Sequence, residues 1–118
     1  MGKNGGIEYI GNFFDGMRHG GGAVFGGGGE VVYRGGWKED SKGGVGLKVC
    51  RVSGRSFVGE FREGMEDGWG ALFEGNGNLI QEGEWRGGRP HGFGRRYDDL
   101  GFKLYEGVFR SGIPVYEN

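Results

Sequence analysis

Glycine recurs at fixed intervals in this chain, and its period constrains the fold more than any other feature. When the sequence is written in rows of 24 residues, one glycine stands at the same place in every row. These glycines are Gly11, Gly35, Gly59, Gly83 and Gly107. Glycine makes up 32 of 118 residues, a share that without a period would be typical of a disordered chain. The period instead predicts a repeat protein.

Aromatic residues flank that glycine in a regular way. If the recurring glycine is position 3 of the repeat, position 5 is aromatic in every row and position 1 is aromatic in all rows except the fourth, which has Gln81. Side chains alternate between the two faces of a strand, so positions 1, 3 and 5 share one face. A glycine between two rings leaves room for a neighbouring ring to lie across the backbone.

A second strand follows in each row. Positions 12 and 14 are glycine in every complete row, and positions 13, 15 and 17 then form a largely apolar series such as Trp69, Ala71 and Phe73. Position 8 is glycine except for Asp40, and aspartate tolerates the positive φ of a tight turn better than most residues. Turn sequences such as the glycines of 26–29 separate the rows, so each repeat is predicted to be a β-hairpin. We expect positions 2 and 4 to form a solvated, mixed face.

Each row combines an aromatic-x-Gly-x-aromatic strand, a glycine-containing loop and a second strand that opens with Gly-x-Gly. This pattern resembles the MORN (membrane occupation and recognition nexus) repeat. The closest matches are YIGNFFDGMRHGGG, EGEWRGGRPHGFG and YEGVFRSG, and the resemblance extends from Ile7 to Gly112. It implies an all-β fold, an elongated single-layer antiparallel sheet of stacked β-hairpins with a 24-residue period. With strands about 4.8 Å apart, such a stack would be about 45 Å long.

The repeats divide the chain into one array, residues 1–118. Repeats start at residues 9, 33, 57 and 81, a partial repeat starts at 105, and residues 1–8 resemble the tail of a preceding repeat. Tyr116 stands where position 12 requires glycine, which leaves the last strand in doubt. Because an open sheet has an unpaired strand at each end, the terminal hairpins are expected to take a cap or to form a homodimer.

Charge and cysteine content narrow the class of protein. The formal net charge is −1, with 15 basic and 16 acidic side chains, so no nucleic-acid partner is expected. The single cysteine, Cys50, favours a reducing compartment. No apolar run approaches the ~20 residues of a membrane-spanning helix. These features favour a cytoplasmic protein, with a location peripheral to a membrane or the cytoskeleton as a further option.

The chain lacks recognisable catalytic or cofactor motifs. His19 and His91 occupy the same repeat position three repeats apart, too far to share a metal ion. Cys50 has no histidine in its row to activate it, and the recurring carboxylates Glu60 and Glu84 are expected to be solvated charges. No Gly-rich phosphate-binding motif is present. We therefore expect a non-enzymatic protein without metal or cofactor.

The aromatic stripe is the strongest candidate for a binding site. In a single layer no second sheet would cover the rings, and exposed aromatic rings are good anchors for a protein partner. The expected occupant is a partner helix in the groove or a strand added at one end. The candidate residues are Tyr9, Phe13, Tyr33, Trp37, Phe57, Phe61, Trp85, Tyr105 and Phe109. The predicted function is a protein–protein interaction or scaffold module.

The alternative is a regulatory module that associates with anionic lipid such as phosphoinositide. The resemblance implies it, since related arrays are joined to a lipid kinase or a methyltransferase. A polybasic membrane patch usually takes about 4–8 clustered Lys or Arg, whereas the basic residues here are scattered. The candidate lipid-binding residues are Arg18, Lys42, Arg89, Arg95 and Arg96.

Overall fold

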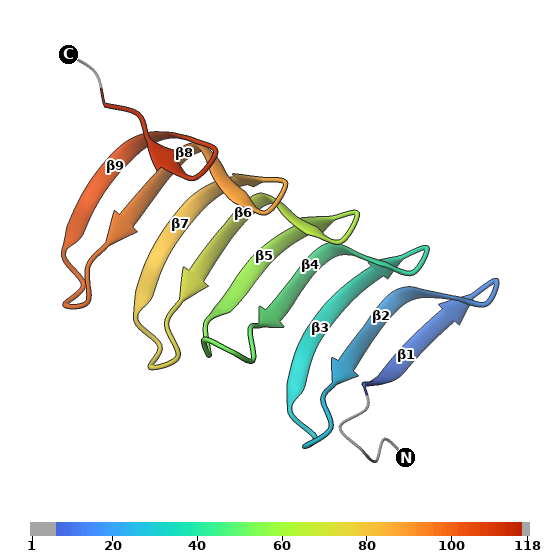
Figure 1. Cartoon of the computed structure of the whole chain (residues 1–118). Coiled ribbons are helices and arrows are strands. Elements are labelled where there is room, and N and C mark those ends of the chain that lie inside the picture. Colours follow the sequence, from blue (N-terminus) through green and yellow to red (C-terminus); the bar gives the residue numbers. More distant parts are fainter. Residues whose placement is uncertain (1–6, 117–118) are drawn as a thin grey trace.

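The protein is a single open antiparallel sheet. The structure, a computed structural model, describes residues 7–116, and in that range it contains ten strands and no helix. Every strand pairs with the next one in the sequence, so the spatial order is the chain order (Figure 1). The strands are β1 (Glu8–Phe14), β2 (Met17–Phe25), β3 (Val31–Lys38), β4 (Ser41–Val49), β5 (Ser56–Arg62), β6 (Met65–Phe73), β7 (Leu79–Arg86), β8 (Arg89–Tyr97), β9 (Lys103–Arg110) and β10 (Ile113–Pro114). The predicted all-β sheet of stacked hairpins is confirmed.

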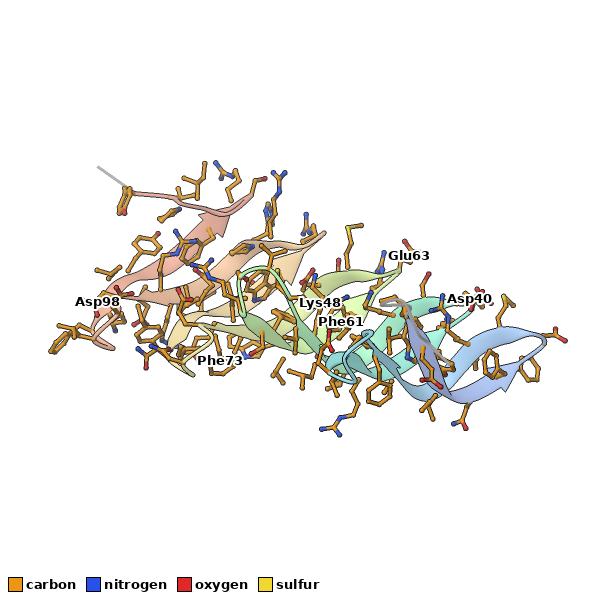
Figure 2. All side chains as sticks on the ribbon, turned by 60° about the horizontal axis from the view of Figure 1, so that its bottom comes forward. Asp40, Lys48, Phe61, Glu63, Phe73 and Asp98 are labelled. Carbon is orange, nitrogen blue, oxygen red and sulfur yellow. The ribbon has the colours of Figure 1, made fainter. Side chains whose placement is uncertain are left out.

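The sheet is a thin, elongated ribbon. Its principal extents are 55, 29 and 16 Å, so it is longer than the expected 45 Å or so. The hairpin turns of all five repeats lie along one long edge of the ribbon, and the connections between repeats lie along the other (Figure 1). Side chains stand on both broad faces, and no second layer covers either face within the described residues (Figure 2).

Each hairpin closes with two residues of positive φ, the signature of the type I′ turn that suits the strand twist. In the third repeat these residues are Glu63 (φ 51°) and Gly64 (φ 86°). Asp40 occupies the same turn position at φ 72°, as predicted. Neighbouring turns are joined by the backbone, since the amide of Gly64 donates to the carbonyl of Lys42 at 3.0 Å. The turn edge is therefore a continuous hydrogen-bonded stack.

The recurring glycines make room for rings, as predicted. Gly35 on β3 pairs with Gly46 on β4, and the ring of Tyr33 lies over this glycine pair. A Cβ added at Gly46 would overlap the Tyr33 ring. The Tyr33 hydroxyl donates to the carbonyl of Gly36 at 3.0 Å, which satisfies its polar end.

The glutamates at position 4 bind the backbone. The register of the β5–β6 pair shifts between Gly59 and Phe61, and the extra residues on β6 include one with positive φ, Gly68 (φ 111°). Glu60 Oε1 accepts from the backbone N–H of Trp69 at 3.2 Å in this irregular stretch. Glu84 repeats the contact with the N–H of Phe93 at 3.0 Å. Both carboxylates are exposed, as predicted for solvated charges, and each also accepts an amide that the bulged strand leaves without a partner in the sheet.

The two ends of the array differ from its middle. The last strand, β10, comprises only Ile113–Pro114, which agrees with the doubt raised by the loss of repeat glycines there. The predicted tail of a preceding repeat falls mostly on residues 1–6, which lie outside the described residues.

The connection between the first two repeats is the predicted glycine turn. The amide of Gly29 donates to the carbonyl of Gly26 at 3.0 Å, so residues 26–29 form a turn.

Candidate functional site

The aromatic face, which carries repeat positions 1, 3 and 5, is built from rings in edge-to-face contact. The ring of Tyr33 lies 5.2 Å from that of Trp37 in its own repeat and 5.2 Å from that of Phe61 in the next repeat. Both pairs are nearly perpendicular, a favourable geometry for aromatic rings. The indole N–H of Trp37 donates to the carbonyl of Gly22 at 3.1 Å. Tyr9, Tyr33 and Phe57, the position 1 rings of the first three repeats, thus each join two successive repeats.

Most of these rings are buried, contrary to the expectation that the stripe keeps exposed area. The rings pack edge to face on glycine backbone and fill the space that a second layer would otherwise fill. The buried members of the stripe, with their exposed fractions, are Tyr33 (0%), Trp37 (6%), Phe57 (2%), Phe61 (4%), Trp85 (7%) and Phe109 (1%). Among the other predicted site residues, Phe13 is 62% exposed, and Tyr9 and Tyr105 are half-buried. The stripe is mainly the core of the protein.

Cations cover part of this core. The Arg18 guanidinium lies 4.4 Å from the Trp37 ring centroid, and the Lys42 ammonium lies 5.4 Å from that of Tyr33. Both basic residues stand at position 10, whose side chains share the face of the position 5 rings. Burial, with a contribution from nearby Lys48, lowers the pKa of Lys42. These side chains cover the rings and shield them from solvent. The sequence did not predict this contact between the basic and aromatic residues.

Arg18 also links the first two hairpins. Its backbone N–H and its Nε both donate to Asp40 Oδ1 at 2.9 Å. Its Nη2 donates to the Asp40 carbonyl at 3.0 Å. The hydrogen bond from the Arg18 backbone, followed by that from its side chain, lowers the pKa of the Asp40 carboxyl. Asp40 therefore also binds Arg18 and connects the turn of the second hairpin to the first hairpin.

The stripe is interrupted at the fourth repeat. Gln81 is buried there, with an exposed fraction of 2%, and its Oε1 accepts from Arg96 Nε at 2.7 Å. Arg96 also donates to the Gly112 carbonyl at 3.1 Å and places its guanidinium 4.9 Å from the Phe109 ring centroid. This polar pair replaces a ring and adjoins a hollow of about 370 Å³. The hollow is lined by Arg55, Leu72, Ile80, Gln81, Trp85, Pro90 and Arg96.

Three segments of the chain, residues 9–22, 33–55 and 82–99, match the family model of the MORN repeat. The chain contains MORN repeats. The first two segments begin at repeat starts that the period predicts, and the third begins one residue after such a start. A search of curated proteins finds no match to the chain. The MORN period, the paired glycines and the ring stack thus describe one structural unit.

The opposite face of the MORN sheet carries repeat positions 2, 4, 6, 13 and 15, and it includes exposed apolar residues of both strands of the hairpin. Position 13 on the second strand of each hairpin pairs with position 4 of the next repeat, for example Trp69 with Glu84. The predicted apolar series of the second strand therefore lies on this face. Its exposed apolar residues include Ile10 (60%), Val45 (67%), Val58 (44%), Trp69 (49%), Phe93 (37%) and Val108 (50%). The face is thus mixed and exposed, as predicted, and the apolar residues of the second strand add to it.

The five candidate lipid-binding residues do not come together in the MORN array. Cross-strand pairing places Arg18, Lys42 and Arg96 on the aromatic face. Arg89 and Arg95 lie on the opposite face, where Arg95 is within 3.8 Å of Glu82 and 3.6 Å of Glu106. Arg18, Lys42 and Arg96 thus contact aromatic rings or backbone carbonyls of the chain. Arg95 lies beside two carboxylates.

Other candidate chemical groups lie apart from one another. Cys50 is exposed, and hydrogen bonds from Ser53 and the neighbouring backbone lower the pKa of its thiol to about 7. His19 and His91 each accept a backbone N–H through Nδ1, from Glu39 and Ser111 respectively. Residues 7–116 contain no group of three or more potential metal ligands and no helix long and apolar enough to cross a bilayer.

Proposed function

We propose that this MORN-repeat chain is a non-enzymatic protein-binding module that holds a segment of a partner on its aromatic face at the fourth repeat. The observation that carries the proposal is the hollow beside the Gln81–Arg96 pair. Elsewhere on this face a ring at position 1 fills the corresponding space. The loss of that ring at Gln81 leaves a recess in an otherwise filled surface.

The chemistry of the hollow suits an apolar side chain of a partner. Leu72, Trp85 and Pro90 supply apolar walls, and the Arg96 guanidinium forms a charged rim. Concave, mainly apolar sites with a few fixed polar groups are typical of binding pockets. The pairing of Arg96 with Gln81 and with the Gly112 carbonyl holds the rim in place. We infer that the site takes an aromatic or aliphatic anchor residue.

The anionic-lipid alternative has less support. Its five candidate residues are divided between the two faces, and Arg18 is engaged by Asp40. A membrane surface contacts one face of a thin sheet at a time, so these residues cannot act as one patch. A homodimer through the terminal hairpins stays a prediction.

A peptide display library selected against the full chain tests the proposed function. We expect selected peptides to bind with an affinity that Leu72→Arg lowers more than tenfold, because the new side chain occupies the hollow. The matched control is Ala71→Arg, which makes the same kind of change at the adjacent position on the opposite face. Fluorescence anisotropy of labelled peptides measures both. Failure to select any peptide, or equal losses in the two variants, would contradict the proposal.

A further inference from the structure

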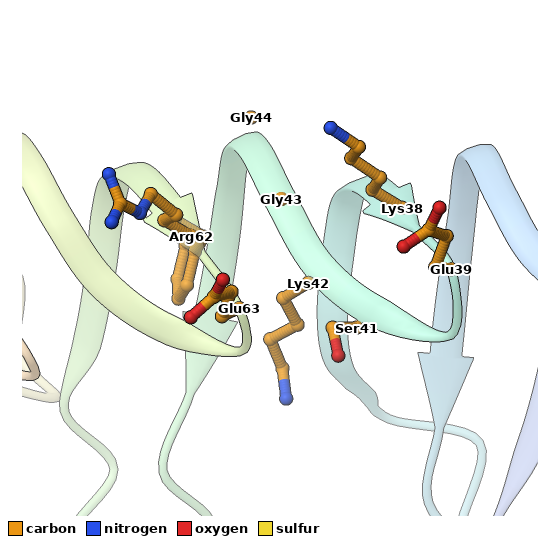
Figure 3. A pocket seen from close by; sticks show the side chains of 9 residues that line it. Lys38, Glu39, Ser41, Lys42, Gly43, Gly44, Arg62 and Glu63 are labelled. Atoms are coloured by element: carbon orange, nitrogen blue, oxygen red, sulfur yellow. The ribbon is translucent and has the colours of Figure 1, made fainter.

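A row of basic residues runs along the opposite face near the turn edge. Position 6 of the repeat follows the aromatic position 5, so its side chain points away from the core. In the last four repeats this position is Lys38, Arg62, Arg86 and Arg110, and all four are exposed. In Figure 3, Lys38 and Arg62 project to one side of the sheet while Lys42 projects to the other. A pocket of about 420 Å³ lies between the two neighbouring turns.

The basic side chains of this row are available to bind a ligand. None of the four forms an ion pair with a carboxylate within residues 7–116. Arg89, the cross-strand neighbour of Arg86, adds a fifth exposed cation without an ion pair in the same range.

The acidic residues of the same face are already engaged. Glu60 and Glu84 accept backbone N–H groups of the irregular strands. Glu82 accepts the Tyr97 hydroxyl at 2.7 Å, and Glu106 pairs with Lys103. Glu39 and Glu63 stand beside Lys38 and Arg62 in the turns and line the same pocket. Within residues 7–116 neither forms an ion pair with the basic row, so its four cations recur at regular intervals without a carboxylate partner.

An exposed apolar row accompanies the basic row. Val45, Trp69 and Phe93 occupy position 13 in successive repeats, and each pairs with position 4, which is two residues before the basic position on the neighbouring strand. Charge and apolar surface therefore run side by side along the stack. This combination fits a linear ligand that has both acidic and apolar side chains.

The spacing of the basic row defines the ligand further. Each repeat contributes two strands about 4.8 Å apart, so successive cations are about 10 Å apart along the stack. Three residues of a polyproline II segment, at about 3.1 Å each, cover about 9.3 Å. An extended chain with an acidic residue at every third position therefore has carboxylates at nearly the same spacing as the basic residues of the row.

We propose that the opposite face binds an extended acidic segment of a partner protein that lies along the stack of hairpins. Its carboxylates pair with Lys38, Arg62, Arg86 and Arg110, and its apolar residues pack against Trp69 and Phe93. This site goes beyond the proposed function, since it uses the face that the hollow does not.

The test uses the full chain and a fluorescein-labelled synthetic peptide made of Glu-Pro-Val triplets. We expect saturable binding by anisotropy that Arg62→Glu combined with Arg86→Glu weakens more than tenfold. The matched control is Lys48→Glu combined with Arg51→Glu, the same change of charge away from the basic row, and it should weaken binding less than threefold. Binding should also shift tryptophan emission, and Trp69→Phe should abolish the shift because Trp37 and Trp85 are buried.

Several outcomes would overturn the proposal. They are the absence of saturable binding, equal losses in the two charge variants, and equal affinity for a peptide of the same composition with its glutamates clustered. Binding of phosphatidylserine vesicles with the same dependence on Arg62 and Arg86, but no binding of the peptide, would assign the face to a membrane instead. Leu72→Arg should leave peptide binding unchanged, so this proposal and the proposed function can fail independently.

Discussion

At the scale of single residues, a missing Cβ decides where each ring can lie. Gly46 and Gly35 face each other across two strands, and the Tyr33 ring occupies the space above them. Glycine in a strand is normally unfavourable because it loses more backbone entropy than other residues. Here the cost is offset by burial of a complete aromatic side chain.

We therefore predict effects of different size for alanine substitutions at two glycines of the same strand. Gly46→Ala should lower the free energy of unfolding by about 1–3 kcal/mol, because the new Cβ overlaps the Tyr33 ring. Gly43→Ala should change it by less than about 0.5 kcal/mol, since the nearest atom to its Cβ is Lys38 Cβ at an ordinary 3.5 Å. Urea unfolding followed by tryptophan fluorescence measures both. Equal losses would show that Gly46 is not required by the ring.

At the scale of the element, the hairpin turn sets the twist and the stacking of each repeat. Both turn residues have positive φ in every hairpin, although only the turn at Gly87 and Gly88 has glycine at both places. A side chain other than glycine or asparagine in this conformation is strained, at about 1–2 kcal/mol. Backbone hydrogen bonds between successive turns hold the conformation in place.

Glu63→Asn should stabilise the protein by about 0.5–1 kcal/mol, because Asn-Gly is a preferred pair for a type I′ turn and Glu63 lies at φ 51°. The rise in melting temperature by differential scanning calorimetry measures this gain. The adjacent substitution Arg62→Asn is the control. Arg62 lies in a strand, where asparagine is unfavourable, and we expect no gain there. A loss of stability in Glu63→Asn would mean that the glutamate has an unrecognised contact.

At the scale of the whole molecule, stability comes from contacts between neighbouring repeats. Rings at positions 1 and 5 join each repeat to the next as far as Trp85, which lies 4.9 Å from Phe57. The ring series then stops, and Gln81 with Arg96 takes over the contact to the last repeat. The side-chain contact between the fourth and fifth repeats is thus made by a polar pair and a cation over a ring, rather than by two rings.

Buried Tyr33 makes the stability of the array depend on alkaline pH. Burial raises the pKa of its hydroxyl from 10.0 to about 12, so the folded state keeps a proton that the unfolded state loses. This contribution is complete below about pH 10 and is lost as the pH rises towards 12. At pH 11 we expect a loss of about 1.4 kcal/mol relative to neutral pH.

Tyr33→Phe isolates this effect, since Phe57 shows that phenylalanine fits the same repeat position. Guanidinium unfolding at pH 8 and pH 11 should show a smaller alkaline loss in Tyr33→Phe than in the unchanged chain. The same loss in both proteins would assign the pH dependence to other groups.

The sequence alone determined the architecture of this protein. A strict period, glycine at position 3 and rings at positions 1 and 5 specify local hairpins, and hairpins joined by short turns pair with their neighbours in order. The turn conformation of Asp40 and the incomplete last strand also followed from departures in the repeat. These features are local, so a linear reading can find them.

Only the tertiary structure decided which surfaces are open. Whether the ring of Trp37 is buried depends on Tyr9 and Tyr33 in two repeats and on the side chain of Arg18 above it. The strand register, shifted by a bulge in each of the first four hairpins, decided that the apolar series lies with Glu84 rather than with the rings. Burial and register depend on the packing of neighbouring repeats in space, which the residues of one repeat do not fix.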